Sequence, residues 1–219
     1  MRDDASLKRY YAARAREYER IYSRPERQQD LERLRALLPP LFAGRRVLEV
    51  ACGTGYWTGI VAREASEVVG IDANPETLQV AAEKSLPPGR VVFRAADAYA
   101  LPEELGSFDA AFAGFWWSHV PVRERARFLA ALDRRLAPGA RVVLLDNVYV
   151  EGSSTPIAER DAEGNTYQRR RLDDGAEHLV MKNFPAEAEL RADVAGCGRE
   201  LRYVQLEYYW LCSYEKLSA

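Results

Sequence analysis

Two glycines separated by a single residue follow a short apolar stretch in the first quarter of the chain. The sequence from Val47 to Thr58 reads VLEVACGTGYWT, which is typical of a strand that enters a tight turn at Gly53 and Gly55 and continues into a helix. Glycine lets the backbone turn sharply and approach a ligand with no Cβ in the way. This segment therefore predicts a binding site for a flat, nucleoside-like ligand.

The residues around the turn distinguish between two classes of such ligands. A dinucleotide site calls for a third glycine, but Thr58 stands at that position and Gly59 follows one residue late. Tyr56 and Trp57 also crowd the start of the helix, where a pyrophosphate would lie. Glu49 instead places a carboxylate near the turn, which suits a ligand that carries a sulfonium and an ammonium group. The charges favour S-adenosylmethionine over a dinucleotide.

Two further carboxylates follow the next two predicted strands. Asp72 lies about 20 residues after the glycine turn, where a carboxylate can hold the two hydroxyls of a ribose. Asp97 can accept a hydrogen bond from an adenine amino group, and the backbone of Ala98 can donate one. Each of the three acids also has a structural explanation, as a strand-end polar group, a helix N-cap or a turn former. Three acids at three successive strand ends are nevertheless more specific than any one of them.

Aromatic residues and a histidine follow the fourth predicted strand, and a tyrosine follows the fifth. S-adenosylmethionine donates a methyl group, and the molecule that receives it is called the acceptor here. Ligands of parallel α/β sheets bind at the carboxyl ends of the strands, so we expect the acceptor between Phe115–His119 and Asp146–Tyr149. Methyl transfer is an in-line displacement on a sulfonium carbon, and alignment and exclusion of water can supply much of the rate. No covalent enzyme nucleophile is required.

His119 is the candidate general base, and Trp116 and Tyr149 are further candidates for the catalytic site. An imidazole has a suitable pKa for taking a proton from a phenol, an amine or a thiol at neutral pH. The alternative is that the His-Val-Pro turn only orients the next helix. Trp116 and Trp117 offer flat surfaces to an aromatic or cationic acceptor, although core packing explains one of the two equally well. We expect no metal, because Asp146–Asn147 alone is no set of acidic ligands.

These candidates need a scaffold in which strands and helices alternate. Short apolar strands are predicted over residues 46–50, 68–71, 91–94, 110–115 and 141–146, and helices over 57–64, 75–84 and 122–136. Residues 1–40 contain two leader helices, over 8–19 and 26–38, which we expect to form a lid. The alternation predicts a parallel sheet with helices on both faces.

An insertion over residues 151–184 interrupts this alternation. Its first part, 151–165, is polar and predicts a loop, and Asp173-Asp174-Gly175 between two extended runs predicts a β-hairpin. We expect this arm to cover the acceptor pocket and to bring an arginine to an anionic acceptor. After the arm, the sequence predicts a helix over 185–195 and one long aromatic strand over 201–214.

Side-chain alternation along the hairpin suggests which of its residues face the acceptor. Tyr167, Arg169 and Arg171 share one face, and His178 and Lys182 lie across it. The residues that we expect to bind the acceptor are Trp117, Tyr167, Arg169, Arg171 and His178.

The composition fits one compact enzyme or binding domain. The chain has 219 residues, 31 of them basic and 33 acidic, so its formal net charge of −2 creates no global field for a nucleic acid. Arginines cluster over 14–27 and 169–171, and most such runs are solvated faces. Cys52, Cys197 and Cys212 are odd in number and far apart, as expected in a reducing compartment. With acids at the start and no long apolar run, we expect a cytoplasmic protein that does not insert into a membrane.

Five segments in order, VLEVACGTG, VVGIDANPETL, RAADAYALP, FDAAFAGFWWSHVP and LAPGARVVLLDN, resemble the class I S-adenosylmethionine-dependent methyltransferases. Within this family the chain is most similar to the small-molecule branch that includes enzymes of ubiquinone and menaquinone biosynthesis. The resemblance extends from about Tyr10 to Asp146, and beyond it only the terminal helix and strand match. It implies a single domain with a Rossmann-like α/β fold. Its seven-stranded, mostly parallel sheet would have the order 3-2-1-4-5-7-6, with the last strand antiparallel.

The resemblance also implies the cofactor, S-adenosyl-L-methionine, which leaves as S-adenosyl-L-homocysteine. The implied contacts are Glu49, Gly53, Thr54, Gly55, Asp72, Ala73, Asp97 and Ala98. It further suggests that Tyr11 and Tyr18 help to cover the methionine end. We expect Ala51, Trp57 and Phe115 to line the same site, and Ala51 is a departure because many relatives have glycine there.

We therefore expect a methyltransferase that acts on an oxygen, nitrogen or sulfur atom of a small molecule, as a monomer or a homodimer. A nicotinamide-dependent short-chain reductase shares the early motifs, but it uses a Tyr-x-x-x-Lys pair. None of the 12 tyrosines here is followed by lysine four residues later. The remaining alternative is a domain that binds the cofactor or a partner protein without catalysis.

Overall fold

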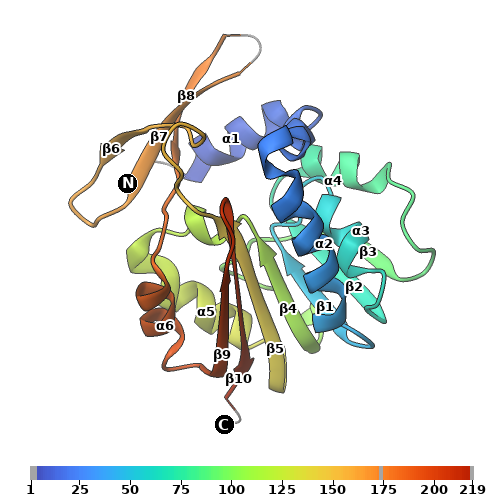
Figure 1. The fold of residues 1–219 in the computed structure, drawn as a ribbon. Helices are drawn as coiled ribbons and strands as arrows, with labels where there is room; N and C mark the ends of the chain where they lie inside the picture. The colour runs from blue at the N-terminus through green and yellow to red at the C-terminus, as the bar shows by residue number, and fades with distance from the viewer. Residues whose placement is uncertain (1–3, 173–174, 218–219) are drawn as a thin grey trace.

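The computed structural model describes residues 4–172 and 175–217, and its core is a seven-stranded sheet (Figure 1). The strands lie in the order β3 (Val91–Ala95), β2 (Glu67–Asp72), β1 (Arg46–Val50), β4 (Phe108–Gly114), β5 (Leu136–Asn147), β10 (Tyr209–Lys216) and β9 (Gly198–Gln205). Strands β1 to β5 run parallel, and β10 is antiparallel to both of its neighbours. The predicted order 3-2-1-4-5-7-6 is confirmed, because β9 and β10 take the places of the sixth and seventh strands.

The central strands are buried because their sequences are almost uniformly apolar. Val47, Leu48 and Val50 of β1 are fully buried, as are Phe112 of β4 and Leu144 of β5. Strands of a parallel sheet that is covered on both faces read as continuous apolar runs rather than as alternating patterns. Polar side chains are therefore concentrated at or near the strand ends, which is where the candidate site lies.

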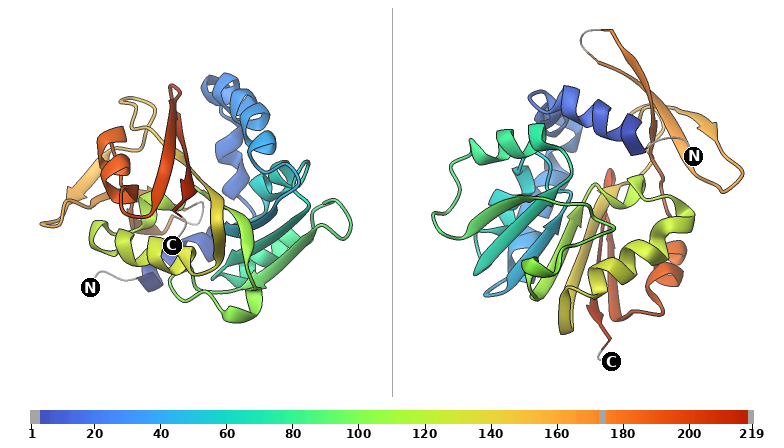
Figure 2. Two further views of the ribbon diagram at one scale, coloured as in Figure 1. Left: turned by 90° about the horizontal axis from the view of Figure 1, so that it is seen from below. Right: turned by 180° about the vertical axis from the view of Figure 1, so that it is seen from behind.

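Helices cover both faces of the sheet, as predicted (Figures 1 and 2). They are α2 (Gln28–Leu41), α3 (Tyr56–Val61), α4 (Pro75–Ala82), α5 (Arg125–Asp133) and α6 (Glu187–Val194). One core cluster contains Leu34 and Ile60 from α2 and α3, and a second contains Phe128 and Leu190 from α5 and α6. Each cluster includes side chains from the sheet, so the sheet is held between two apolar layers.

An antiparallel three-stranded sheet projects beyond the carboxyl edge of the main sheet (Figures 1 and 2). Its strands are β6 (Ile157–Arg160), β7 (Thr166–Arg171) and β8 (Glu177–Met181), and we refer to residues 157–181 as the arm. The predicted hairpin is confirmed in β7 and β8, while Asp173 and Asp174 of its turn lie outside the described residues. The predicted loop over 151–165 is wrong in part, because β6 pairs with β7. The four residues of β6, IAER, are too few and too polar to indicate a strand.

Residues 4–27 form the leader, which lies across the same carboxyl edge (Figure 1). It consists of α1 (Asp4–Arg14) and two 3-10 turns, Tyr18–Ser23 and Pro25–Arg27. The predicted helix over 8–19 is therefore wrong in its bounds, since α1 ends before Tyr18. The predicted helix over 122–136 is likewise too long, because α5 ends at Asp133.

The predicted single strand over residues 201–214 is wrong, because this segment folds as the hairpin of β9 and β10. The Leu206 N–H donates to the Tyr209 carbonyl at 2.8 Å across the turn. The Tyr208 N–H donates to Oδ2 of Asp30 in α2 at 2.8 Å, which anchors the turn to the domain. No glycine, proline or asparagine marks this turn, so local sequence gives no signal for it. Within the described residues, no helix is long and apolar enough to cross a membrane.

Candidate functional site

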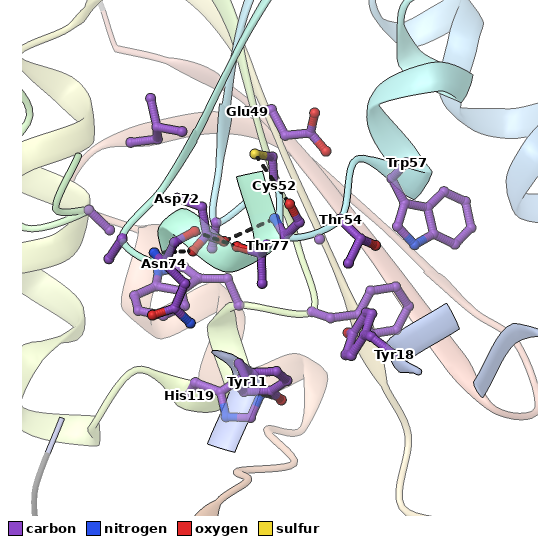
Figure 3. A pocket seen from close by; sticks show the side chains of 18 of the residues that line it. Tyr11, Tyr18, Glu49, Cys52, Thr54, Trp57, Asp72, Asn74, Thr77 and His119 are labelled. Atoms are coloured by element: carbon purple, nitrogen blue, oxygen red, sulfur yellow. Dashed lines mark hydrogen bonds between the residues drawn. The ribbon is translucent and has the colours of Figure 1, made fainter. Parts of the chain in front are cut away.

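A cavity opens at the carboxyl ends of β1, β2 and β4, the edge at which ligands were predicted to bind (Figure 3). We refer to it as the first cavity. Of the residues expected to bind the cofactor, those that line it are Tyr11, Tyr18, Glu49, Ala51, Gly53, Thr54, Trp57, Asp72, Ala73, Asp97, Ala98 and Phe115. Gly55 lies behind the turn instead, where an added Cβ would come within 3.1 Å of Ala81 in α4.

The turn after β1 has the backbone conformation that its glycines permit. Gly53 and Gly55 have φ values of +55° and +76°, in the left-handed region that favours glycine. Ala51 also adopts a left-handed φ of +53°, which costs about 1–2 kcal/mol for a residue with a Cβ. Ala51 therefore adopts a backbone conformation that glycine would adopt with less strain.

Asp72, at the end of β2, holds this turn in place (Figure 3). Its Oδ2 accepts a hydrogen bond from the Gly53 N–H at 2.9 Å, and its Oδ1 accepts one from the Asn74 N–H at 2.8 Å. Burial raises the pKa of the Asp72 carboxyl above its usual value. A carboxylate has about four lone-pair positions, so each oxygen keeps capacity for a ribose hydroxyl.

Glu49 places a carboxyl group with an unsatisfied oxygen beside the first cavity (Figure 3). The side chain is only 2% exposed, and its Oε2 has no hydrogen-bond partner among the described residues. Burial raises the pKa of Glu49 to about 8. Because a buried polar group without a partner is costly, this oxygen fits a ligand that brings a positively charged donor. The ammonium group of S-adenosylmethionine is such a donor.

The leader is fastened to the glycine turn at two points. Oε1 of Glu19 accepts a hydrogen bond from the Thr54 hydroxyl at 2.6 Å, and the Lys84 Nζ lies 2.8 Å from the same oxygen. The Tyr22 hydroxyl accepts a hydrogen bond from Nε1 of Trp57 at 3.0 Å. These contacts place aromatic side chains of the leader over the first cavity.

A second cavity lies between the leader, the arm and the ends of β4 and β5. The basic residues that line it are Arg14, Arg20, Arg24, Arg27, Arg169, Arg170, Arg171 and Lys182, against a single acid, Glu17. The interpretation of the arginine clusters as solvated faces is correct for most of these side chains, which are exposed. It is wrong for Arg14, Arg27 and Arg170, which are half-buried where the leader and the arm meet around this cavity. Five residues, Tyr11, Tyr18, Tyr22, Phe115 and His119, line both cavities, and we refer to them as the junction.

Phe115 reaches the junction because the backbone turns sharply where β4 ends. Its φ is +60°, and its N–H donates to the Leu145 carbonyl of β5 at 2.6 Å. The ring packs against those of Tyr22 and Trp57, with centroids 5.9 and 6.0 Å away. A left-handed conformation at a bulky residue costs about 1–3 kcal/mol and is typically kept at functional sites.

His119 is held at the junction by two hydrogen bonds. Its Nδ1 lies 2.6 Å from the Met181 carbonyl, and its Nε2 lies 2.8 Å from the Tyr11 hydroxyl. Since a carbonyl can only accept, Nδ1 carries the proton, and the lone pair of Nε2 accepts from Tyr11. Burial, with the nearby charges of Lys182 and Arg170, lowers the pKa of His119 well below its usual value. The imidazole is therefore neutral at pH 7.

The other candidates from the fourth and fifth strand ends lie in different surroundings. Trp116 lines the first cavity, and its Nε1 has no hydrogen-bond partner among the described residues. Trp117 is fully buried in the core, where its ring packs near Phe128 and under the Arg125 guanidinium. Tyr149 is 37% exposed and packs edge-on against Phe184. The structure thus brings Trp116 to the site and places Trp117 and Tyr149 away from the junction.

Both faces of β7 border the second cavity, since Arg169 and Arg171 of the predicted face line it together with Gln168 and Arg170 of the other. The Tyr167 hydroxyl donates to Asp161 at 2.9 Å, beside a separate hollow, and Arg169 is exposed and lies 3.9 Å from Glu159 and from Glu177. Arg171 borders the second cavity but is also exposed. The opposite face of β7 carries Arg170, which alternates with these residues and packs toward the leader.

Arg170 is the residue that sequence reasoning missed. In three successive arginines, alternation shows that the middle one faces away from its neighbours but not which face is covered. His178, which was predicted, pairs with Arg170 across β7 and β8, and its ring lies 5.5 Å from that of Tyr10 in α1. The contact between α1 and the arm determines which face of β7 is covered, and no local sequence pattern indicates this contact.

Lys182 joins the end of the arm to the end of β5. Its Nζ donates to Ser118 Oγ at 2.7 Å and to Asp146 Oδ1 at 2.7 Å, and Asp146 Oδ2 accepts from the Ser118 N–H at 2.9 Å. Both charged side chains are almost completely buried. In the part of the chain that the structure describes, no group of three or more His, Cys, Asp or Glu side chains could hold a metal ion.

Known proteins resemble this chain in sequence. A family model described as a methyltransferase domain matches residues 47–139. The chain is similar to the demethylmenaquinone methyltransferase of Thermus thermophilus, with 34% identity over 182 residues, which cover 76% of this chain and 79% of that protein. It is also similar to the ubiquinone biosynthesis O-methyltransferase of Xanthomonas axonopodis pv. citri, with 35% identity over 177 residues, which cover 80% and 70% of the two proteins.

Solved structures resemble the fold over almost its full length. A complex of DhpI with SAH superposes with a TM-score of 0.77 at 28% sequence identity, and covers 98% of this chain and 97% of that chain. A complex of DhpI with SAM and HEP gives a TM-score of 0.74 at 26% identity, with 96% of each chain covered. At this coverage the similarity includes the leader and the arm as well as the main sheet.

Proposed function

The chain belongs to the class I S-adenosylmethionine-dependent methyltransferases, and from that premise we propose that it methylates an oxygen, nitrogen or sulfur atom of a small molecule bound in the second cavity. It is an enzyme, and its cofactor is S-adenosylmethionine. The observation that carries the proposal is the junction. Five side chains line both cavities, so a donor in the first and an acceptor in the second would meet there.

The first cavity fits the cofactor by the chemistry of its donors and acceptors. The unpartnered Oε2 of Glu49 would hold the ammonium group, and Asp72 would hold the ribose hydroxyls. Asp97 and the backbone of Ala98, after β3, remain the proposed partners of the adenine edge. When bound, S-adenosylmethionine supplies a methyl group on a positively charged sulfur, which is open to displacement from the side opposite that sulfur.

The junction provides alignment and keeps water away. Its walls are aromatic rings, including those of Tyr22 and Phe115, which exclude solvent and restrict the approach of the acceptor. The acceptor atom supplies the electron pair of the new bond to the methyl carbon, the sulfur keeps the pair of the bond that breaks, and the acceptor proton passes to a base. Holding two reactants in line is worth several kcal/mol of the barrier.

His119 is the proposed base. Its Nε2 lone pair faces the junction, and in the absence of acceptor it is occupied by the Tyr11 hydroxyl. An acceptor hydroxyl or amine that replaces Tyr11 as the donor would pass its proton to Nε2, while the Met181 carbonyl stabilises the proton on Nδ1. The alternative that His119 only orients the next helix leaves its two long-range hydrogen bonds without a role.

The positive charge of the second cavity favours an acceptor other than a quinone. The two curated relatives are named for menaquinone and ubiquinone biosynthesis, and a quinone ring carries no charge. Seven arginines line the second cavity. We therefore propose a small polar acceptor, enclosed by residues 1–40 as one lid and by the insertion over 151–184 as another.

A product screen tests the proposal. The full chain is incubated with S-adenosylmethionine and panels of phenols, carboxylates, phosphate esters, amines and thiols, and S-adenosylhomocysteine is measured together with the mass of the methylated acceptor. We expect stoichiometric formation of both products with at least one polar acceptor. Cofactor binding with neither product in any panel would instead favour the alternative of a non-catalytic binding domain.

A further inference from the structure

The side chains that line the second cavity carry mostly positive charge, and only half of these cations, Arg20, Arg24, Arg169 and Lys182, are paired with carboxylates among the described residues. Eight basic side chains line it against Glu17 alone, in a chain whose net charge is −2. Among the side chains that the structure describes, those of residues 9–172 and 175–217, no carboxylate forms an ion pair with Arg14, Arg27 or Arg170. The positive charge is therefore concentrated at this cavity and at these three guanidinium groups.

Among the described side chains, Arg170 has only neutral partners. Its Nη2 and Nε donate to Oε1 of Gln168 at 2.8 and 3.3 Å, and its guanidinium lies 5.8 Å from the centre of the Tyr10 ring. Gln168 is fixed in turn, because its Nε2 donates to the Thr155 carbonyl at 2.6 Å. A guanidinium has five N–H donors in a fixed plane, so Arg170 is oriented and keeps donors for a ligand.

Arg14 and Arg27 approach the same cavity from the leader. Arg14 donates to the Tyr10 hydroxyl at 2.7 Å and lies 5.7 Å from the centre of the Tyr10 ring, so it and Arg170 share one aromatic partner. Arg27 donates to Ser153 Oγ at 3.2 Å, and its buried Nε has no hydrogen-bond partner among the described residues. Three guanidinium groups, two from the leader and one from the arm, thus line one hollow.

The two fully buried cations among the described residues, Lys182 in the wall of the second cavity and Arg125 outside it, do have acidic partners. Lys182 contacts Asp146 at 2.7 Å, and Arg125 contacts Asp193 at 2.8 Å. A partly buried cation without a counter-charge is costly, because its desolvation is not offset. Because three such cations gather at the second cavity, a negatively charged ligand would offset the cost of burying them.

We propose that the second cavity recognises its acceptor through a small phosphate-type oxyanion, held by Arg170 together with Arg14 and Arg27. This proposal rests on the proposed function, because it names the chemical class of the same acceptor. A single carboxylate would be satisfied by one bidentate arginine, whereas three guanidiniums around one hollow match the charge and the several oxygens of a dianion. The cavity volume of about 400 Å³ limits the acceptor to a small molecule.

The experiment uses the full chain saturated with S-adenosylhomocysteine and titrated calorimetrically with inorganic phosphate and, separately, with acetate. We expect phosphate to bind at least tenfold more tightly than acetate. In Arg170→Gln, phosphate affinity should fall at least tenfold while the affinity for S-adenosylhomocysteine stays within twofold of wild type. The retained cofactor affinity shows that the variant is folded.

Arg160→Gln is the matched control, because Arg160 lies on the same arm, is exposed, and lies outside the second cavity. It removes the same charge and should leave phosphate affinity unchanged. Equal loss of phosphate affinity in both variants would overturn the proposal and indicate diffuse electrostatic attraction. Equal binding of acetate and phosphate, or no binding of phosphate, would also overturn it. If S-adenosylhomocysteine itself does not bind, the proposed function fails, and the comparison of phosphate with acetate still decides the nature of the second cavity.

Discussion

The carboxyl group of Glu49 is the point at which cofactor binding should couple most directly to pH. Its pKa of about 8 in the free protein means that it is mostly protonated at pH 7. An ammonium ligand favours the carboxylate, so binding must release a proton below pH 8. We expect affinity for S-adenosylhomocysteine to rise by up to about tenfold per pH unit from pH 6 and to level off above about pH 8. Calorimetry in buffers of different ionisation enthalpy measures both the affinity and the proton released.

Glu49→Gln provides the control for this coupling. It should bind the cofactor weakly and with no dependence on pH over this range. Because burial raises the folded-state pKa above the unfolded value, the wild type loses stability as pH rises from about 4.5 to 8. The variant lacks this loss, so it should melt at a higher temperature than the wild type at pH 8 and at a similar temperature at pH 4.5. If the wild type binds S-adenosylhomocysteine with the same affinity from pH 6 to pH 8.5, Glu49 is not the partner of its ammonium group.

His119 gives a second test at a single side chain. If Nε2 accepts the acceptor proton, His119→Gln should lower kcat by about 10²–10⁴-fold with little change in cofactor affinity. The lowered pKa keeps the wild-type imidazole neutral, so kcat should show no decrease between pH 8 and pH 6 from protonation of this residue. A near-wild-type rate for His119→Gln, measured at saturating acceptor, removes the role as a base.

The secondary-structure elements show where sequence patterns suffice and where they do not. The strands that end at Val50 and Asp72, and the turn at Gly53, were predictable because apolar runs and glycines act through their immediate neighbours. The hairpin turn at Leu206 and the inward face of Arg170 were not, since each is set by contacts with distant segments. The Tyr11–His119 hydrogen bond joins residues 108 positions apart, and no spacing rule reports such a pair.

The connection between the arm and the main sheet should depend on Lys182 and Asp146. Replacing Lys182 by methionine leaves the Asp146 carboxylate buried without its cation, which typically costs about 3–5 kcal/mol. We expect a corresponding decrease in the free energy of unfolding in urea and faster proteolysis within the arm.

The double variant Lys182→Met with Asp146→Asn should recover part of this loss, because it removes both charges together. The asparagine side chain has nearly the same shape as the aspartate that it replaces, so the end of the strand keeps its packing. If the two single losses simply add in the double variant, to within about 0.5 kcal/mol, then the ion pair does not couple the arm to the sheet.

The folded chain as a whole places its chemistry between segments that are remote in sequence. The main sheet and the glycine turn form the first cavity, while the leader and the arm complete the second. Composition alone indicated a nearly neutral chain, and only the fold gathers arginines of the leader and of the arm around one hollow. The lining of the first cavity could therefore be predicted from sequence except for Gly55, whereas the way in which the leader and the arm meet around the second required the three-dimensional structure.

The central claim is that the transferable methyl group faces the junction. S-adenosylmethionine with a ¹³C-labelled methyl group, bound to the full chain, allows nuclear Overhauser effects from that methyl to be measured selectively. We predict cross-peaks to ring protons of Phe115, Tyr11 or His119, and the loss of the cross-peak to the replaced ring in Phe115→Leu. If the methyl group of the bound cofactor shows cross-peaks only to residues outside the junction, the claim is contradicted.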